Sequence, residues 1–484
     1  MSAPADAKGQ LRRVMGFWDV LLFNVASVVG PRWIAAAAHN GTSSISLWVL
    51  AATLFFLPST FILAELSTRY PSEGGLYAWS KEAFGEFHGF VAGWTYWIYT
   101  FFYFPGLLMA SAAMMAYVGG QGNAFLAQNR AFLMAGSFFL LFIAVFLNII
   151  GLNIGKWLQN AGGIGTYVPP LMLAGLAFYL WHLHGSVTHF TWQNIKPVWN
   201  WDTVNFWPQI AFAFGGLELA SAMSEEVRDP QKTFPRAILG SGISITMLYM
   251  IGTVSILTVL PAANVDPKSG VFQALTSSAT LLGIGFFAIV ASVFNVFGSA
   301  GGIGTTVAGV SRIPFVVGID RYLPSAFGKI HPKWKTPWIS ILVQAGISCA
   351  ILLVIQINES ANSAYQILVD AGSVLYFIPF VYIYAAFIKL SYRRDRESNR
   401  DAVLVPGGKP GVWIAGLLGF MVVLAAIALS FIPPAESANK WVFEAKLVAG
   451  TFGGIFLGLI LYFRGVRQKK REAAQAMNMA AKGM

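Results

Sequence analysis

Charged residues are scarce in this chain of 484 residues, because Asp, Glu, Lys and Arg together make up only 11% of it. A soluble protein of average composition carries about 25%. So few charges could not cover the surface of one or two soluble domains of this size. The composition, with 56% hydrophobic residues and a mean hydropathy of +0.62, excludes an ordinary soluble enzyme and a disordered protein. It predicts an all-α polytopic membrane protein.

Cysteine and enzyme motifs are scarce as well. Cys349 is the single cysteine, so the chain cannot form an internal disulfide and is not a disulfide scaffold. The sequence has no phosphate-binding P-loop, zinc-protease, serine-hydrolase or dinucleotide motif, and its charged loops are too short for an ATPase domain. We therefore expect no enzyme, no cofactor and no metal. The polar segment before the first hydrophobic stretch lacks an apolar core and is no signal peptide.

Long hydrophobic stretches are what the sequence does contain. A membrane span needs about 20 mostly apolar residues, and these stretches are too long and continuous for barrel strands. Twelve qualify, with approximate bounds of 16–38, 46–68, 87–118, 131–151, 161–184, 206–226, 236–261, 283–312, 337–357, 365–390, 411–432 and 442–464.

The 32 Lys and Arg residues fall mainly on one side of these expected spans. With a cytoplasmic N-terminus, the outer segments hold few basic residues, namely Arg130, Lys196, Lys268, Lys440 and Lys446. Basic residues favour cytoplasmic loops. The net charge of +11 therefore reflects membrane topology and not nucleic-acid binding. The distribution of the basic residues predicts a multi-pass protein of the cytoplasmic (inner) membrane with both termini cytoplasmic.

Two spans carry interruptions near their middle. The first contains Gly30-Pro31, where proline removes a donor and biases the preceding residue away from the helix. The sixth contains Gly215-Gly216 followed by Glu218. A broken helix at membrane depth usually lines a cavity, and paired breaks in two halves point to the site of an inverted-repeat transporter. Ordinary kinks are the alternative explanation.

The chemistry of such breaks suits a zwitterion. Free N–H groups at the start of a half-helix suit a carboxylate, and free carbonyls at the end of another suit an ammonium. We expect the carboxylate near Gly30 to Trp33 and the ammonium near Ala26, Ser27 and Phe212 to Gly215. Amino acids have this shape. The predicted substrate-binding residues are Ala26, Ser27, Val29, Gly30, Arg32, Trp33, Phe212, Phe214, Gly215 and Glu218.

Several short segments resemble those of a known transporter family. They are residues 71–77 (PSEGGLY) and 83–85 (AFG), 214–218 (FGGLE), 225–230 (EEVRDP), 234–238 (FPRAI), 311–312 (SR), 320–324 (DRYLP) and 335–337 (KTP). Together and in this order, they resemble the amino acid–polyamine–organocation (APC) transporters, of the bacterial amino acid permease type, over nearly the whole chain.

This resemblance implies a LeuT-type fold and alternating-access transport of amino acids or related amines. The expected organisation is a cytoplasmic segment 1–15 and a ten-helix core 16–390, with repeats of about 16–184 and 206–390. Two further helices at 411–464 and a basic cytoplasmic tail at 465–484 follow. Proton coupling or solute exchange would drive the transport. Thr166 or Tyr167 stands where some proton-coupled relatives carry a lysine in the fifth helix.

Arg32 and Glu218 are the ionisable residues expected near mid-membrane, where a charge is costly and functional by default. Arg32 is atypical of the family and resembles the bacterial branches near the glutamate/GABA exchangers. It would bind a carboxylate of the substrate, such as the side chain of an acidic amino acid, form a structural pair with Glu218, or snorkel to the outer surface. Burial would favour the neutral acid of Glu218, and a nearby Arg32 would favour its carboxylate. Glu218 is thus predicted to carry a proton, sense pH or bind an amine, with a static salt bridge as the alternative.

The remaining predictions concern single side chains. The third span is crowded with aromatic residues, most of them expected to pack and one or two to line the cavity: Trp94, Tyr96, Trp97, Tyr99, Phe101, Phe102, Tyr103 and Phe104. Phe214 adjoins a break and is the expected gate. Asn295 and Ser299 form a cation site or serve helix packing. Gly450, Gly454 and Gly458 serve a homodimer contact or packing within the chain.

The sequence thus predicts a secondary active amino acid transporter, a symporter or antiporter. A polyamine or organic cation transporter is the alternative substrate class, which Glu218 would suit and Arg32 argues against. A channel or a sensor on the same scaffold is the alternative from another functional class.

Overall fold

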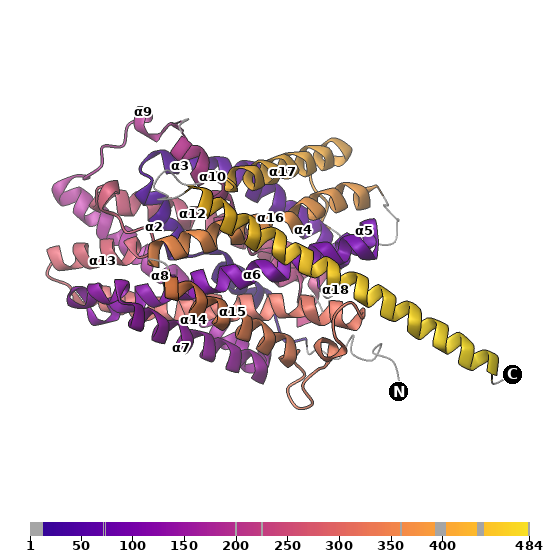
Figure 1. The fold of residues 1–484 in the computed structure, drawn as a ribbon. Coiled ribbons are helices and arrows are strands. Elements are labelled where there is room, and N and C mark those ends of the chain that lie inside the picture. Colours follow the sequence, from indigo (N-terminus) through magenta and orange to yellow (C-terminus); the bar gives the residue numbers. More distant parts are fainter. Residues whose placement is uncertain are drawn as a thin grey trace.

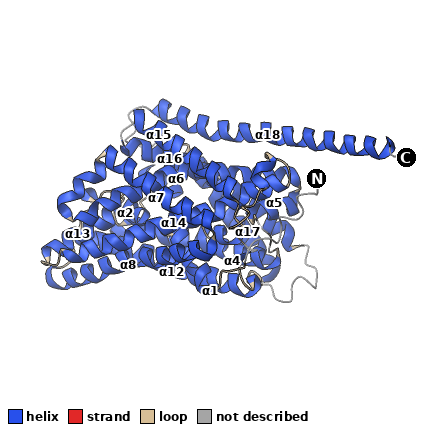
Figure 2. Cartoon of the chain, turned by 90° about the horizontal axis from the view of Figure 1, so that it is seen from below, coloured by secondary structure: helices blue, strands red, loops and turns tan. Residues whose placement is uncertain are grey.

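The computed structural model describes residues 13–70, 72, 74–198, 201–223, 226–358, 361–392, 403–432 and 440–482. Every named element in these ranges is a helix, and the helices form one bundle (Figures 1 and 2). The first twelve residues of the expected N-terminal segment lie outside the described residues.

The first five expected spans are helical, and two of them are divided. They are α1 (Phe17–Val28) with α2 (Pro31–His39), α3 (Ser43–Ala51) with the π-helical η2 (Ala52–Phe56) and α4 (Leu57–Arg69), α6 (Glu86–Met115), α7 (Arg130–Ile150) and α8 (Leu152–His184).

The next five spans repeat the pattern, again with a division in the first of them. They are α10 (Trp201–Ala213) with α11 (Glu218–Ser221), α12 (Pro230–Val259), α14 (Phe286–Ile319), α15 (Trp338–Asn358) and α16 (Ala361–Ser391). The last two are α17 (Gly408–Ser430) and α18 (Lys440–Lys482).

Ten helical segments in the described ranges are long and apolar enough to cross a membrane. The other two expected spans are α10 with α11, which is broken, and α15, whose apolar part runs from Trp338 to Val354. The structure therefore confirms an all-α polytopic membrane protein.

Short helices occupy connections that the sequence analysis left without structure, and one of them lies at the end of the third expected span, 87–118. They are α5 (Leu76–Phe84), η3 (Ala116–Gly119), η4 (Gln121–Gln128), α9 (Trp192–Ile195), η6 (Ala262–Asn264), α13 (Gly270–Leu281) and η7 (Ser325–Gly328). Their lengths are below that of a span, so a search for long apolar stretches does not find them.

Helix α18 extends well past residue 464, where the last span was expected to end. Figure 1 shows this yellow helix leaving the bundle, with its end far from the other helices. The sequence of this extension is rich in Ala, Lys, Arg, Gln and Met, which are good helix formers, and its charges keep it out of lipid. The expected basic tail is thus helical up to Lys482.

Helices α8 and α14 approach each other backbone to backbone. A Cβ placed on Gly162 would lie 2.4 Å from the Cα of Gly301, and one on Gly165 would lie 2.4 Å from the carbonyl oxygen of Phe294. No larger residue fits at either position without moving a helix. These glycines fix the distance between α8 and α14, and both helices contribute to the site described below.

Several of the segments that carry the family resemblance make contacts at one end of the bundle, which we call the basic end because Lys81, Arg312 and Arg321 lie there. The Arg312 guanidinium donates to both carboxylate oxygens of Glu226, at 2.7 and 3.0 Å, and both side chains are buried. Met15 pairs with Val227. The Gly74 amide donates to the carbonyl of Ala222 at 3.2 Å. The resemblance therefore reflects contacts that hold this end together.

A second group of contacts at the basic end centres on Asp320. Lys81 lies 2.6 Å from its carboxylate, and the Tyr77 hydroxyl also donates to it. Burial, and then the Asp320 carboxylate, raise the pKa of the Tyr77 phenol above its usual value, so Tyr77 stays a donor. Helix α18 joins this end through Arg321 and Glu472, 2.8 Å apart.

The glycine stripe of the last span faces α6 of the same chain. A Cβ on Gly458 would lie 2.2 Å from Nε1 of Trp94, and one on Gly454 would lie 2.8 Å from Cδ1 of Ile98. The Trp94 indole donates to the Gly454 carbonyl at 2.9 Å. The stripe is therefore used for packing within the chain, and a homodimer through it would have to displace α6.

Candidate functional site

The first helix break forms where the sequence predicts it. Helix α1 ends at Val28, Val29 and Gly30 are extended, and α2 begins at Pro31. Proline has no N–H to continue the helix and disfavours helical geometry at Gly30. The Trp33 amide donates to the Gly30 carbonyl at 2.9 Å. Few backbone N–H groups therefore remain at this break for a ligand.

The second break depends on two glycines. Helix α10 ends at Ala213 and α11 begins at Glu218, and Gly216 has a φ of +127°, which side-chain-bearing residues rarely adopt. A Cβ on Gly215 would lie 2.3 Å from the hydroxyl oxygen of Tyr376. Neither glycine can be enlarged without moving its neighbours.

The two breaks lie against each other. The Ser27 hydroxyl contacts the Gly216 carbonyl at 3.3 Å. The Tyr249 hydroxyl, from α12, approaches the carbonyls of Val28 and Ala213 at 2.8 and 2.7 Å. Tyr249 thus bridges the carbonyl ends of both broken helices. No motif or break marks this residue, which lies in an ordinary apolar helix.

We expect Tyr249→Phe to lower the free energy of unfolding by about 1 kcal/mol, because two buried carbonyls lose a shared donor while the stacking on Trp48 is kept. Thermal unfolding in detergent, followed by tryptophan fluorescence, measures the change. The matched control is Tyr384→Phe, which removes a buried hydroxyl whose hydrogen bond runs to the Ser59 side chain and to no backbone carbonyl in the described part of the chain. A smaller effect at Tyr249 than at Tyr384 would contradict the bridging role.

Two pockets flank the breaks. The first is lined by Ala26, Ser27, Val28, Val29, Gly30, Pro31, Arg32, Trp33, Tyr103, Leu107, Ser111, Met114, Thr166, Asn295, Gly298, Ser299 and Gly302. The second is lined by Ser27, Trp33, Tyr99, Tyr103, Phe212, Gly215, Gly216, Leu219, Thr306 and Tyr376. Ser27, Trp33 and Tyr103 belong to both linings, so the two pockets adjoin.

Most of the predicted binding residues line these pockets. Those of the first break all line the first pocket, and Phe212 and Gly215 line the second. Phe214 and Glu218 belong to neither lining. Contact with the substrate stays a prediction for these two residues. It also stays a prediction for the predicted residues that line the pockets.

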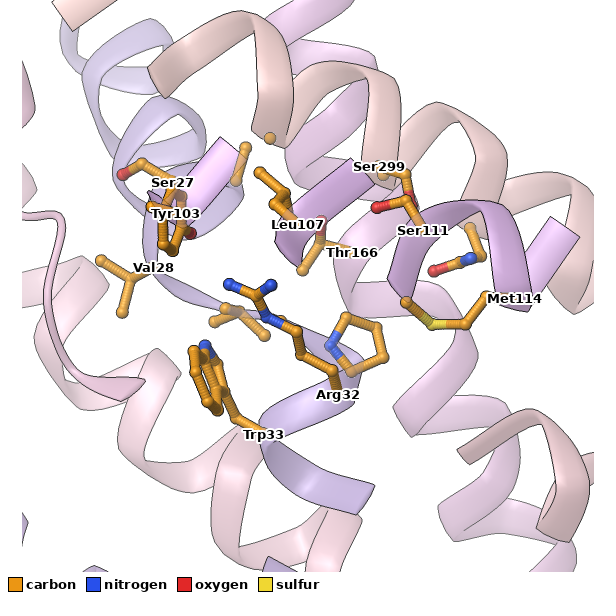
Figure 3. Close-up of a pocket in the computed structure, with 17 residues that line it drawn as sticks. Ser27, Val28, Arg32, Trp33, Tyr103, Leu107, Ser111, Met114, Thr166 and Ser299 are labelled. Carbon is orange, nitrogen blue, oxygen red and sulfur yellow. The ribbon is translucent and has the colours of Figure 1, made fainter. Parts of the chain in front are cut away.

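Arg32 is buried, with 1% of its surface exposed, and lies in the first pocket. Its guanidinium carbon is 4.4 Å from the centre of the Trp33 ring and 5.0 Å from that of Tyr103. Figure 3 shows the guanidinium inside the pocket, with Trp33 on one side and Leu107 and Thr166 on the other. Aromatic faces stabilise the cation without neutralising it.

Glu218 does not pair with Arg32 among the side chains that the structure describes. Its carboxylate accepts hydrogen bonds from Tyr96 at 2.6 Å, from Tyr376 at 2.9 Å and from the Gly216 amide at 3.1 Å. Three hydrogen-bond donors thus stand where the alternative interpretation placed the Arg32 cation. Tyr96 belongs to the aromatic-rich third span, whereas nothing in the sequence singled out Tyr376.

The phenylalanines beside the second break face different surroundings. Phe212 packs edge-on against Trp33 at 5.7 Å and Tyr376 at 5.0 Å, both of which line the second pocket. Phe214 packs against Trp48, Phe56 and Tyr249. The structure therefore favours Phe212 over Phe214 as the aromatic wall of the site.

Asn295 and Ser299, the predicted cation ligands, line the first pocket together with Thr166. The Thr166 hydroxyl donates to the carbonyl of Gly162 within its own helix. Gly302 packs against α1, because a Cβ there would lie 2.8 Å from the Ala26 carbonyl. Arg32 lines the same pocket, so Asn295 and Ser299 share it with a positive charge.

The arrangement of the helices is that of a known class of membrane transporters. The structure of MhsT in complex with L-phenylalanine matches 86% of this chain and 98% of MhsT, with a TM-score of 0.64 and 14% sequence identity. The fold is therefore the LeuT type, as predicted.

The chain belongs to the amino acid permease family, whose model matches residues 15–453. The serine/threonine exchanger SteT of Bacillus subtilis is 28% identical, over 82% of this chain and 87% of SteT. The probable agmatine/putrescine antiporter AguD of Lactococcus lactis is 23% identical, over 94% of this chain and 97% of AguD. The protein is thus a multi-pass membrane transporter of the APC superfamily and not an enzyme.

Proposed function

We propose that the protein is a secondary active transporter, a symporter or antiporter, that moves amino acids across the cytoplasmic membrane by alternating access. The contact of the two breaks at Ser27 and Gly216, between adjoining pockets, is the main support. The exchange of serine and threonine by the relative SteT agrees with it. We also propose that both termini are cytoplasmic, because basic residues concentrate on that side.

In this proposal, a substrate carboxylate binds near Gly30 to Trp33. Proline contributes no N–H there, and the Trp33 amide is used by Gly30. The charge of Arg32 therefore supplies attraction that the backbone cannot. The ammonium lies near the carbonyls of Ala26 and Ser27, where α1 ends.

A polyamine is the second candidate, and AguD as a relative supports it. The site supports it less. Arg32 lines the first pocket, and Glu218, the carboxylate expected to attract an amine, lines neither. A polyamine would bring further positive charge to a buried cation.

Counterflow in proteoliposomes tests the proposed function. The purified protein is reconstituted, the vesicles are loaded with unlabelled solute, and entry of labelled glutamate, serine or putrescine is followed with and without pH and sodium gradients. We expect saturable counterflow of at least one amino acid and none of putrescine. Flux that does not saturate would favour a channel, and binding without flux would favour a sensor.

Glu218 is proposed to carry or sense a proton during transport. We expect Glu218→Gln to flatten the dependence of uptake on external pH, because the amide keeps the shape of the side chain but cannot titrate. Initial uptake rates across a pH series give the profile. Glu444→Gln, which removes an acid on α18 outside both linings, is the matched control. An unchanged profile in Glu218→Gln would rule out the proton role.

A further inference from the structure

The first pocket contains three buried polar atoms without a hydrogen-bond partner in the described part of the structure. They are Nε of Arg32, the hydroxyl oxygen of Ser111 and Nδ2 of Asn295. Each of the three residues is 1% exposed, and each lines the pocket. They come from α2, α6 and α14 respectively. Buried polar groups are normally paired, so three in one cavity point to a ligand that pairs with them.

The chemistry of these atoms favours a ligand that accepts hydrogen bonds. The Arg32 guanidinium donates only, and the Ser111 hydroxyl and the Asn295 amide each have a hydrogen to donate. Carboxylate oxygens accept such bonds, and charged acceptors form the stronger ones. In Figure 3, Ser111 and Ser299 lie on the opposite side of the view from Ser27 and Tyr103. The pocket therefore offers polar groups beyond the helix break itself.

The charge of the pocket leads to the same conclusion. Arg32 is the one charged residue in the first lining, and the second lining, as far as the structure describes it, holds none. A zwitterion has no net charge, so its binding would leave the buried site with a net charge of one positive unit, which is costly. An amino acid with a second carboxylate carries one net negative charge and compensates it. A metal or sodium ion beside Asn295 would instead be repelled by Arg32.

We propose that the first pocket binds the side-chain carboxylate of an acidic amino acid, with Asn295 and Ser111 as its specificity-determining donors. This inference rests on the proposed function, because it names the substrate class of the same transport site. It replaces the cation site predicted at Asn295 and Ser299. One carboxylate of the substrate lies at the break, and the other lies between α6 and α14.

Competition between glutamate and its isostere glutamine tests the proposal. Wild-type proteoliposomes should take up glutamate at least tenfold faster than glutamine or serine, because amino acids with neutral side chains leave the occupied site with a net positive charge. Asn295→Asp keeps the size of the side chain and replaces a donor with an acceptor. We expect it to lower the glutamate-to-glutamine ratio at least tenfold, because the glutamine carboxamide can donate to the new carboxylate. Ser111→Ala should lower the same ratio by a smaller factor.

The matched control is Asn129→Asp. Asn129 caps α7 by accepting from the Phe132 amide, and aspartate caps a helix equally well. Asn129 lines neither pocket, so the glutamate-to-glutamine uptake ratio of Asn129→Asp should equal that of the wild type. If Asn295→Asp is not recovered as a monodisperse protein, the ratio in Ser111→Ala decides the question.

The outcomes separate this inference from the proposed function. Saturable uptake of serine with exclusion of glutamate would overturn the acidic pocket and leave amino acid transport intact. An unchanged ratio in Asn295→Asp would likewise overturn it. Serine uptake that requires chloride, measured against gluconate, would assign the donors to a free anion and overturn it too. Saturable flux of no amino acid at all would refute the proposed function itself.

Discussion

Arg32→Ala is expected to lower the uptake of labelled glutamate by about 30-fold to several thousand-fold. Truncating one partner of a buried, hydrogen-bonded charge pair costs about 2–5 kcal/mol, at 1.4 kcal/mol for each tenfold. The loss would reach this size because the break offers few other donors. Initial rates of counterflow in proteoliposomes measure it.

The same substitution should not destabilise the empty protein. Arg32 is 1% exposed and is placed against two aromatic rings without a described carboxylate partner, so its removal also removes a desolvated charge. The unfolding temperature of the substrate-free variant should stay the same or rise. Arg32→Lys, which keeps the charge without the planar fork, should retain part of the uptake. Loss of folded protein in Arg32→Ala would show a structural role instead.

Gly162→Leu is expected to lower the free energy of unfolding by about 3 kcal/mol or more. Overpacking usually costs about 1–3 kcal/mol, and here the nearest atom is the backbone of Gly301, which no side-chain rotation can move. The yield of monodisperse protein and its unfolding temperature in detergent measure the effect. Transport should fail as well, because α8 and α14 both line the first pocket.

The same helix offers a control for this prediction. Gly175, also in α8, has no atom within 4 Å of a Cβ placed on it, and it is exposed. Gly175→Leu should be neutral or slightly stabilising, since leucine is a better helix former by up to about 1 kcal/mol. Equal losses in the two variants would contradict the role of the close α8–α14 contact.

The fold and the two breaks could be predicted because their causes are local. Hydrophobic length predicts spans, and Gly30-Pro31 and the Gly215-Gly216 pair interrupt helices by their own backbone properties. Most residues placed at the first break therefore line a pocket in the structure. The helical extension of α18 was missed because its sequence is polar and the search was for apolar length.

The partners of the buried charges could not be predicted, because they depend on distances between helices far apart in the sequence. Arg32 and Glu218 each adjoin a break, yet they contact different aromatic residues and not each other. Similarly, Phe212 and Phe214 are both next to the second break. Residues two positions apart in a helix point in nearly opposite directions, and Phe214 already lies beyond the end of α10 at Ala213, so the sequence alone does not tell which of the two faces the site.

The position of Tyr376 bears on how proton binding and substrate binding would influence each other. Its ring lines the second pocket, and its hydroxyl donates to Glu218 and accepts from the Gly216 amide. A single phenol ring thus separates the Glu218 carboxylate from the second pocket. A substrate that shifts this ring would change the number of hydrogen bonds that the Glu218 carboxylate accepts. Protonation of Glu218 would in turn change the hydrogen bond that positions the Tyr376 ring. Coupling of this kind is reciprocal, so its strength can be measured from either ligand.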